Sequence, residues 1–413
     1  MRLLFLTPQL PYPADKGTRI RNLGLIRELA RRHEVAVLSF GEPADRASRA
    51  GLAAICRVVD VLGTPTRPPW RRVVAALTDP RPDLARRLGS VGFTAALRRA
   101  LAEPWDILQI EGLEMAPHWL ALRHERRLPP TIFDAHNAEW VLQARMGATD
   151  LANRRPLGGL YSTLQAARLR PYEGAVVTTV QAVAAVSRAD AAALERVGRP
   201  RRLVLVPNGV DTAGLPRRPG DGDDRTVLFT GTMDYRPNVD AVVWFVARVW
   251  PLVRARAPEA RFRIVGRAPT PAVRALTASP GVDVTGEVAA VGPFFAEAAA
   301  YVAPLRIGGG SRLKLLEACA HGVPIVSTSL GAEGIDLTPG RDALVADDAA
   351  VFAEALLGLL REPARRRALA DAGRALVESS YDWRAIVPRL EGLYEELVRG
   401  RVGRPHGSGV ATA

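Results

Sequence analysis

The feature that most restricts the fold of this chain is a regular alternation of short apolar segments with amphipathic ones. Apolar residues 3–6 predict a strand, and residues 20–32 carry apolar side chains at three- and four-residue spacing, which predicts a helix. The succession continues with predicted strands at 35–38, 58–62, 107–110, 131–134, 183–186 and 203–206. Strands that alternate with helices form parallel sheets. Residues 1–205 therefore predict a doubly wound domain.

A second series of the same kind begins after a linker. Residues 213–225 are rich in Gly, Pro, Asp and Arg and hold few apolar side chains, so we assign residues 206–225 as the linker. Residues 226–380 then predict a second doubly wound domain. We expect a helix over residues 381–402 that packs back toward the first domain, and a disordered tail over residues 403–413. The expected fold is α/β, with two parallel-sheet domains facing across a cleft.

The net charge of +13 raises the question of nucleic-acid binding. The arginines are scattered along the chain, and no aromatic side chains interleave with them to stack bases. We therefore predict no nucleic-acid partner. A basic surface also suits anionic substrates or anionic membrane lipids. Only two of the basic residues are lysines, Lys16 and Lys314, and both lie in glycine-containing segments after predicted strands.

Three observations bear on the compartment. The sequence has no run of about 18 uncharged apolar residues, so no membrane span is predicted. The first apolar run stops at Thr7 and Pro8 without a small-residue cleavage site, which favours a buried strand over a signal peptide. Cys56 and Cys319 are far apart and belong to no motif, which suits a reducing cytosol. We expect a cytoplasmic protein, compatible with peripheral attachment to the inner face of the cytoplasmic membrane.

Residues 301–324 predict an anion site, because a strand leads through a glycine run into a helix. The glycines let backbone N–H groups converge, and the helix N-terminus adds partial positive charge. We predict that Ser311 caps the helix, while Arg312 and Lys314 add full charges in its first turn. Glu317 is placed one turn later to accept hydrogen bonds from the vicinal hydroxyls of a ribose. The glycines are Gly308, Gly309 and Gly310. The alternative is a flexible loop with a solvated carboxylate.

In doubly wound sheets ligands bind beyond the carboxyl ends of the strands. Besides the glycine run, four segments follow predicted strands and carry polar side chains. They are residues 8–17, 134–139, 208–211 and 231–238. The sequence therefore predicts that the chemistry lies in these segments.

Taken together, the segments resemble a retaining glycosyltransferase of the GT-B fold in family GT4. Residues 206–211, 231–241 and 308–323 are similar to motifs that open the second domain and bind the donor in that family. Residues 13–17 resemble the N-terminal segment of sugar transferases tied to exopolysaccharide export. The resemblance covers nearly the whole chain. It implies transfer of a sugar from a UDP- or GDP-sugar to a hydroxyl of a lipid-linked or polysaccharide acceptor, with retention and without a metal.

The resemblance also implies roles for individual residues. His136, at the end of a predicted strand, resembles the histidine that faces the donor sugar. The family has two glutamates eight residues apart; Glu317 matches the second, whereas Gly309 stands in place of the first. The family often clamps the diphosphate with Arg and Lys after the first strand of the second domain, where this chain offers Arg236 but no Lys. We therefore predict that Arg312 and Lys314 stabilise the leaving diphosphate.

The remaining candidates are weaker. Gly17 and Gly231 are predicted to let backbone approach the donor, although each is also explained as a turn glycine. Lys16, Glu139 and Asn208 are candidates for the acceptor or for secondary contacts, with a solvated loop or a turn cap as the alternative. Arg188 is a further candidate of this kind. None of the histidines shows metal-ligand spacing.

Two other functions fit the same architecture. A sugar-nucleotide epimerase would need acid and base groups around the sugar, for which Glu111, His136 and Glu139 are available. A nucleotide-sugar binding protein without catalysis is the other alternative, in view of Gly309. Sugar transfer that depends on an added acceptor separates the transferase from both.

Overall fold

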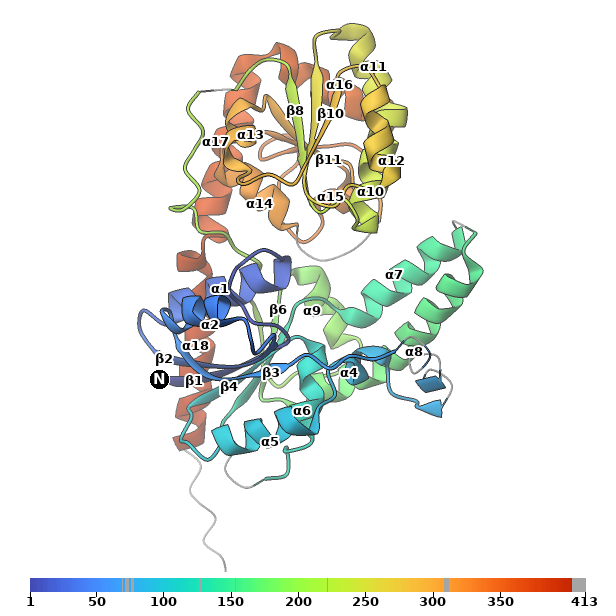
Figure 1. The fold of residues 1–413 in the computed structure, drawn as a ribbon. Coiled ribbons are helices and arrows are strands. Elements are labelled where there is room, and N and C mark those ends of the chain that lie inside the picture. The colour runs from blue at the N-terminus through green and yellow to red at the C-terminus, as the bar shows by residue number, and fades with distance from the viewer. Residues whose placement is uncertain are drawn as a thin grey trace, which may run out of the picture. The chain divides into compact units, whose positions relative to one another are not determined.

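The structure is a computed structural model that forms two compact units (Figure 1). The first comprises Met1–Pro207 and the chain from Ile386 onward, and the second comprises Asn208–Ala385. The structure describes all residues except 69, 71–73, 76–77, 126–127, 153, 221, 308–311 and 403–413. The predicted tail and the predicted glycine run with Ser311 therefore lie outside the described residues.

The first unit is built on a parallel sheet with the strand order β3-β2-β1-β4-β5-β6-β7. Its strands are β1 (Arg2–Thr7), β2 (Glu34–Gly41), β3 (Arg57–Gly63), β4 (Ile107–Glu111), β5 (Thr131–Ala135), β6 (Ala182–Ala185) and β7 (Leu203–Leu205). The strands β4, β5 and β6 are buried along their whole length, as expected for parallel strands covered on both faces. Order and direction confirm the predicted doubly wound sheet.

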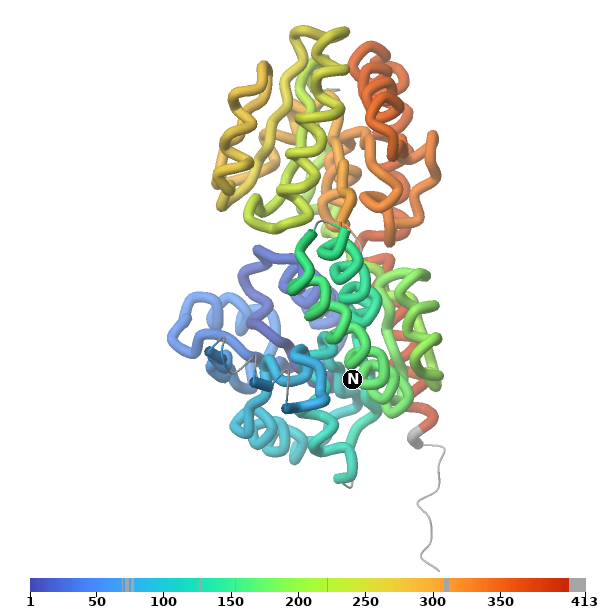
Figure 2. Tube along the Cα trace, turned by 90° about the vertical axis from the view of Figure 1, so that its right-hand side faces the viewer, coloured from blue at the N-terminus to red at the C-terminus, as the bar shows by residue number. Residues whose placement is uncertain are grey.

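Helices cover both faces of this sheet (Figures 1 and 2). They are α1 (Gly17–Leu29), α2 (Arg46–Ala53), α4 (Asp83–Arg87), α5 (Val91–Ala100), the 3-10 turn η1 (Leu113–Met115), α6 (Ala116–Leu120), α7 (Glu139–Ala152), α8 (Pro156–Thr179), α9 (Arg188–Glu195) and most of α18 (Trp383–Val402). The last of these is fixed to the sheet by polar contacts: Tyr394 donates a hydrogen bond to Gln109 of β4, and Glu391 pairs with Arg32 and His33.

The second unit repeats the architecture with six parallel strands in the order β10-β9-β8-β11-β12-β13. The strands are β8 (Thr226–Thr230), β9 (Arg261–Val265), β10 (Val282–Gly286), β11 (Ala300–Ala303), β12 (Ile325–Ser327) and β13 (Leu344–Val345). The helices are α10 (Arg236–Trp244), the π-turn η2 (Phe245–Val249), α11 (Trp250–Arg256), α12 (Pro271–Arg274), the 3-10 turn η3 (Ala275–Ala278), α13 (Gly292–Glu297), α14 (Leu313–Ala320), α15 (Ser329–Ala332), α16 (Ala349–Arg361) and α17 (Pro363–Ser380).

One predicted helix is interrupted. The sequence pattern predicts a single helix over residues 238–257, but the structure has α10, a π-turn and α11 in succession. Pro251 has no backbone N–H to donate to the preceding turn, so the hydrogen-bond ladder cannot continue unchanged through it.

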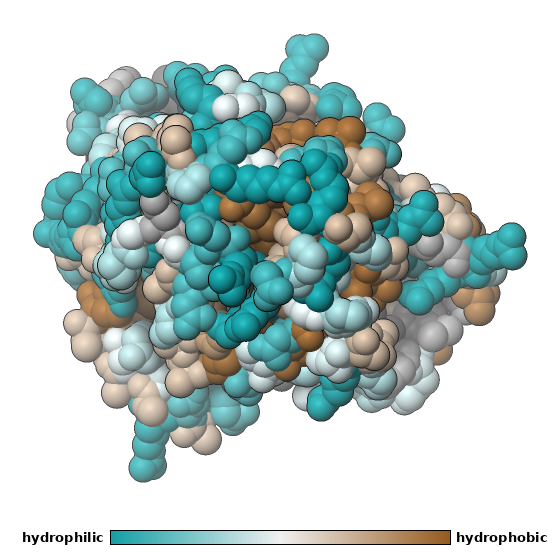
Figure 3. All heavy atoms as spheres, turned by 90° about the horizontal axis from the view of Figure 1, so that it is seen from above, coloured by the Kyte–Doolittle hydropathy of each residue, from teal (hydrophilic) through white to brown (hydrophobic). Residues whose placement is uncertain are grey.

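Among the described residues, none of the helices combines the length and the apolar character needed to cross a bilayer. The face drawn in Figure 3 is mostly hydrophilic, and its apolar groups form small separate patches. Such patches are ordinary on water-exposed surfaces.

Candidate active site

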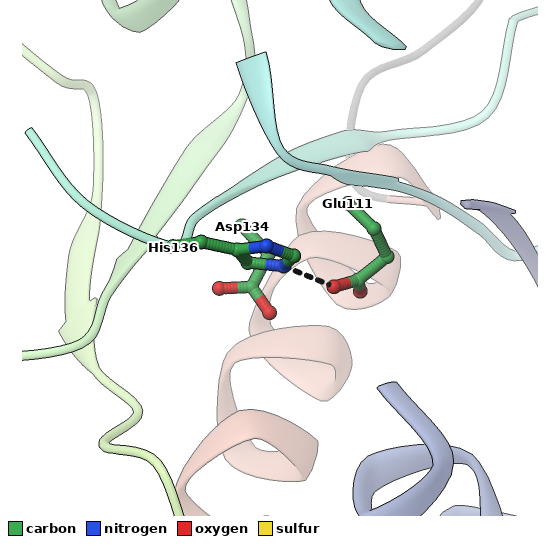
Figure 4. A group of neighbouring side chains, drawn as sticks. All are labelled: Glu111, Asp134 and His136. Atoms are coloured by element: carbon green, nitrogen blue, oxygen red, sulfur yellow. Dashed lines mark hydrogen bonds and ion pairs between the residues drawn. The ribbon is translucent and has the colours of Figure 1, made fainter. Parts of the chain in front are cut away.

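In the first unit, β4 and β5 end side by side and bring Glu111, Asp134 and His136 together (Figure 4). Glu111 and Asp134 are register partners at the carboxyl ends of the two strands. His136 follows one residue after β5, and its Nε2 lies 2.9 Å from a carboxylate oxygen of Glu111. Both carboxylates are fully buried, whereas 15% of the His136 side chain is exposed. The histidine is therefore the member of this group that a ligand can reach.

Asp134 forms a buried ion pair with Arg21 of α1. The guanidinium contacts both carboxylate oxygens, at 2.6 and 3.1 Å, and it also donates to the carbonyl of Pro207 at 3.1 Å. A bidentate pair of this kind fixes orientation as well as charge. It holds α1, and with it the preceding predicted ligand loop at residues 8–17, against the edge of the sheet.

Glu111 accepts hydrogen bonds from several side chains. Gln109 donates to one oxygen at 2.7 Å, and His136 contacts the other. In the amide orientation that satisfies both of its ends, Asn22 of α1 donates to the same oxygen as His136 at 2.8 Å. The carboxylate is thus immobilised by groups from β4, α1 and the end of β5.

These contacts set the proton affinities of the pair. Burial, reinforced by the charge of Asp134, raises the pKa of Glu111. Burial by itself would lower the pKa of His136, but the hydrogen bond to Glu111 and the charge of Asp134 outweigh it and raise that pKa. Since Nε2 is hydrogen-bonded to Glu111, Nδ1 is the ring nitrogen left to contact a ligand.

The same three side chains have the composition of a metal-ligand set, with one ligand atom from each lying within 4.8 Å of the others. However, both oxygens of Asp134 already contact the guanidinium of Arg21. A second cation beside that guanidinium would be repelled. The arrangement is therefore better explained as a network of ion pairs, and our expectation of transfer without a metal stays a prediction.

The other predicted residues of the first unit lie around this edge. Glu139 is the first residue of α7, and burial, followed by the charge of Glu114, raises its pKa to about 7. Glu173 accepts hydrogen bonds from the backbone of Glu139 and Trp140, which fixes the start of that helix. Lys16 and Gly17 are exposed at the start of α1. Arg188 is the exposed first residue of α9.

In the second unit, Lys314 of α14 reaches the carboxyl end of β8. Its Nζ donates to Oδ1 of Asn238 at 2.8 Å, and Nδ2 of Asn238 donates to the carbonyl of Thr232 at 2.9 Å. Asn238 thus connects the ammonium to the loop that follows the strand. Gly231 lies at the same point with φ +156°, and a Cβ there would come within 3.0 Å of the Lys314 Nζ. The tightest contact of such a Cβ would be with Nδ2 of Asn238, at 2.6 Å, so the positive φ and the Asn238 amide together favour the predicted glycine.

The environment of Lys314 is unfavourable for its charge in the absence of a ligand. Burial, and then the charge of Arg312, lowers the pKa of Lys314 to about 7. The face of the Phe229 ring, whose centre lies 4.2 Å from the ammonium, offsets part of this cost through a cation–π contact. One turn along the helix, burial raises the pKa of Glu317 to about 7. An anion that approached Lys314 would restore its charged form.

Arg312 and Arg236 lie at the starts of two helices of the second unit. The structure places Arg312 at the N-cap position of α14, with φ −92° and ψ 85°. Arginine has no side-chain acceptor, so it offers no capping hydrogen bond there. Ser311 lies outside the described residues, so its predicted capping role stays a prediction. Arg236 is the partly exposed first residue of α10. Asn208, the first residue of the second unit, is also partly exposed.

Sequence reasoning missed Asn238, Arg21 and Asp134 as site residues and ranked Glu111 low. Asn238 and Asp134 lie within the predicted ligand segments 231–238 and 134–139, and Glu111 is the last residue of β4. Their location at the ends of strands could therefore have identified them from the sequence. Their partners could not be identified in this way, because each pair joins residues far apart in the chain.

Comparison with known proteins agrees with this arrangement. Residues 17–213 match the family described as Glycosyltransferase Family 4, and residues 224–362 match the family described as Glycosyl transferases group 1. A phosphatidyl-myo-inositol mannosyltransferase of Mycobacterium leprae is 31% identical over 214 residues, which are 47% of this chain and 54% of that protein. The chain spans about half the length of the curated relatives that it matches.

Solved structures show the same fold. The sucrose-phosphate synthase of Thermosynechococcus elongatus superimposes with a TM-score of 0.70 at 19% identity, covering 97% of this chain and 100% of that one. HepE of Anabaena, solved in complex with UDP and glucose, gives a TM-score of 0.64 at 14% identity, covering 96% and 100%. The two parallel-sheet units, the strand-end residues and both family matches lead to one conclusion: this chain belongs to the GT4 family of glycosyltransferases, with the GT-B fold.

Proposed function

We propose that this glycosyltransferase moves a sugar from a UDP- or GDP-sugar to an acceptor hydroxyl, with retention at the anomeric carbon. The observation that carries the proposal is the ammonium of Lys314 at the carboxyl end of β8, hydrogen-bonded to the neutral amide of Asn238. A cation held by a neutral partner in a partly buried position favours an anionic ligand, and the donor's diphosphate is such a ligand. That HepE was solved with UDP supports the choice of ligand class.

The leaving diphosphate gains negative charge as the bond to the sugar breaks. Lys314 is held in position before the reaction by Asn238, so its charge would stabilise the transition state without reorganisation. Binding of the diphosphate would also raise the lowered pKa of Lys314 and keep it protonated. Arg312, buried at the N-cap position of the same helix, adds a second positive charge. Glu317, one turn further, would accept hydrogen bonds from the ribose.

His136 would contact the donor sugar through Nδ1, the nitrogen that is not hydrogen-bonded to Glu111. Glu111 would then act as a positioning residue, because it fixes the ring and selects which nitrogen carries the proton. The reaction needs no nucleophilic carboxylate in this scheme, which is consistent with a front-face route to retention.

We further propose a lipid-linked or polysaccharide acceptor, in the synthesis of a cell-surface glycan, and a cytoplasmic location with peripheral attachment to the membrane. The similarity to a phosphatidyl-myo-inositol mannosyltransferase supports an acceptor carried by a lipid. The excess of basic over acidic residues, +13, is compatible with attraction to anionic lipid.

The experiment is a donor-binding and transfer assay on wild type and Lys314→Ala. We expect the melting temperature of wild type to rise with UDP or GDP, and the substitution to abolish the rise and lower kcat/KM by about 100- to 1,000-fold. Arg306→Ala is the matched control, because Arg306 lies in the segment before α14 but is exposed and paired with Asp240. If Lys314→Ala bound nucleotide and transferred sugar like wild type, the proposed donor site would be wrong.

A further inference from the structure

The helices α7 and α8 form a hairpin that projects from the sheet of the first unit (Figures 1 and 2). The hairpin starts at Glu139, three residues after His136, so it leaves the sheet directly at the candidate active site. The two helices pack closely through small residues: a Cβ at Gly147 would lie 2.8 Å from Oγ1 of Thr163, and one at Gly159 would lie 2.6 Å from Leu151. The hairpin is therefore a defined two-helix element.

The far end of this hairpin exposes large apolar side chains. Leu157 is 84% exposed and Leu160 is 68% exposed, while Leu151 at the end of α7 is 53% exposed. Leu164 continues the row and is 39% exposed. Because residues 157, 160 and 164 are separated by three and four positions, they lie on one side of α8. A gathered set of exposed leucines is a mark of an interaction surface, unlike single exposed apolar residues.

The charges around these leucines are positive. Residues 140–172 contain five arginines and one acidic residue, Asp150, which is 7% exposed. Arg154 and Arg155 are exposed in the connection between the two helices, next to Leu157. Among the described residues of the hairpin tip, leucines and arginines are therefore exposed together without an exposed carboxylate.

We infer that the tip of the α7–α8 hairpin docks onto an anionic lipid bilayer. Leucine side chains enter the boundary between headgroups and acyl chains, and neighbouring arginines meet the lipid phosphates. A projecting tip suits a fluid surface, whereas a protein partner would need a groove of matching shape. Docking at this point would hold His136 within about 20 Å of the bilayer, the length of the 14-residue helix α7, and so on the side where a lipid-linked acceptor is carried. The inference extends the proposed function, which includes a lipid-linked acceptor.

The test is sedimentation of the full chain with vesicles of phosphatidylcholine, with and without phosphatidylglycerol. We compare wild type with Leu157→Ser/Leu160→Ser and with Arg154→Ser/Arg155→Ser. Leu252→Ser/Val351→Ser is the matched control, since those side chains are 43% and 55% exposed in the second unit. The melting temperature and the oligomeric state of each variant are measured alongside, so that a folding defect or self-association is recognised.

We expect wild type and the control to bind phosphatidylglycerol vesicles, and the leucine variant to bind at least tenfold more weakly. The arginine variant should lose about fivefold in affinity for each arginine, on anionic vesicles and at low salt only. Failure of wild type to bind, or equal binding by the leucine variant, would overturn the inference. So would a dimer that the leucine variant dissociates without any change in vesicle binding. Sedimentation needs neither donor nor acceptor, so these outcomes leave the proposed sugar transfer untouched.

Discussion

Both units have charged residues at the carboxyl ends of their parallel strands. In the first unit these residues are paired with opposite charges, whereas in the second a cation is paired with a neutral group. In the first unit, Arg21 has Asp134 as its partner, and His136 has Glu111. In the second unit, Lys314 donates to the neutral amide of Asn238, and the nearest carboxylate along its helix, that of Glu317, has its pKa raised by burial. The charges at the strand ends of the first unit therefore neutralise one another, whereas the charge of Lys314 in the second unit is available to an anionic ligand.

The difference suggests that the strand-end residues of the first unit orient a side chain, whereas those of the second unit bind a ligand. A buried ion pair costs desolvation and contributes little net stability, but removal of one partner leaves an uncompensated charge. The network around Glu111 thus fixes His136 in place. A cation with a neutral partner weakens the ligand-free fold, and that cost is recovered when an anion binds. The comparison predicts that substitutions at the two edges change stability in opposite directions.

The largest effect is expected at the paired edge. Arg21→Met leaves Asp134 buried without its partner and should destabilise the first unit by about 3–5 kcal/mol. The measurement is the midpoint of urea unfolding. Arg98→Met is the control, because its pair with Glu125 is exposed and should matter little. Similar midpoints for the two variants would contradict the view that the first edge depends on its own pairing.

The opposite sign is expected for Lys314→Met. Burial lowers the pKa of the Lys314 amino group to about 7, so its charged form is costly in the folded protein. Methionine removes this charge and keeps an apolar side chain against Phe229. The free energy of unfolding of the ligand-free protein should rise by about 2 kcal/mol. This is less than the free energy that corresponds to the whole pKa shift, because the side chain is partly exposed. The gain should be complete below about pH 7 and fade as the pH rises toward 10.5, where the lysine is neutral in both states. The midpoints of urea unfolding across this pH range measure the gain. If Lys314→Met were less stable than wild type, the predicted opposite effects in the two units would be contradicted.

A smaller effect is expected for Glu111→Gln. The amide cannot accept from all the donors around it, and it lacks the charge that raises the pKa of His136. We expect kcat to fall by about tenfold with little change in the KM for the donor. The limb of the pH–rate profile that belongs to His136 should move to lower pH. Glu114→Gln is the control, since Glu114 pairs with Arg87 instead. A purely structural role for Glu111 would leave the pH profile in place.

The smallest effect concerns Glu317. Burial raises the pKa of Glu317 from 4.5 to about 7. Below about pH 4.5 the carboxyl is protonated in both states and does not destabilise the fold, whereas as the pH rises through 7 it must be buried as a charge, which lowers the stability of the folded protein. Glu317→Gln should therefore be more stable than wild type by about 1 kcal/mol above pH 7, with the difference vanishing near pH 4.5. The difference between the two melting curves at several pH values measures this. A difference that stays constant with pH would show that Glu317 is not buried in solution.

Much of the site could be predicted, because ligand loops follow strands and strands are visible as apolar runs. His136, Gly231, Lys314 and Glu317 lie in or directly after such loops and were predicted for that reason and from the family resemblance, and the structure places Lys314 beside Gly231. The glycine run and the predicted cap, Ser311, lie outside the described residues, so the start of α14 is described only from Arg312 onward. Their roles in catalysis remain predictions.

The partners of these residues could not be predicted. Arg21 and Asp134 are 113 positions apart, and Lys314 and Asn238 are 76 apart. Periodicity describes only neighbours along the chain, so it cannot assign such pairs. The same holds for Leu157 and Leu160, because a helical apolar pattern does not tell whether its leucines face a core or solvent.

Local patterns and contiguous motifs suffice to predict the two parallel sheets, the loops at their carboxyl ends and the family. The three-dimensional arrangement is needed to know which charges are paired and which nitrogen of His136 remains for a ligand. It is also needed to know that α7 and α8 expose leucines and arginines at a common tip. Pairing, burial and exposure depend on which distant segments meet in space. Those meetings set the dielectric environment and the hydrogen-bond partners from which the chemistry follows.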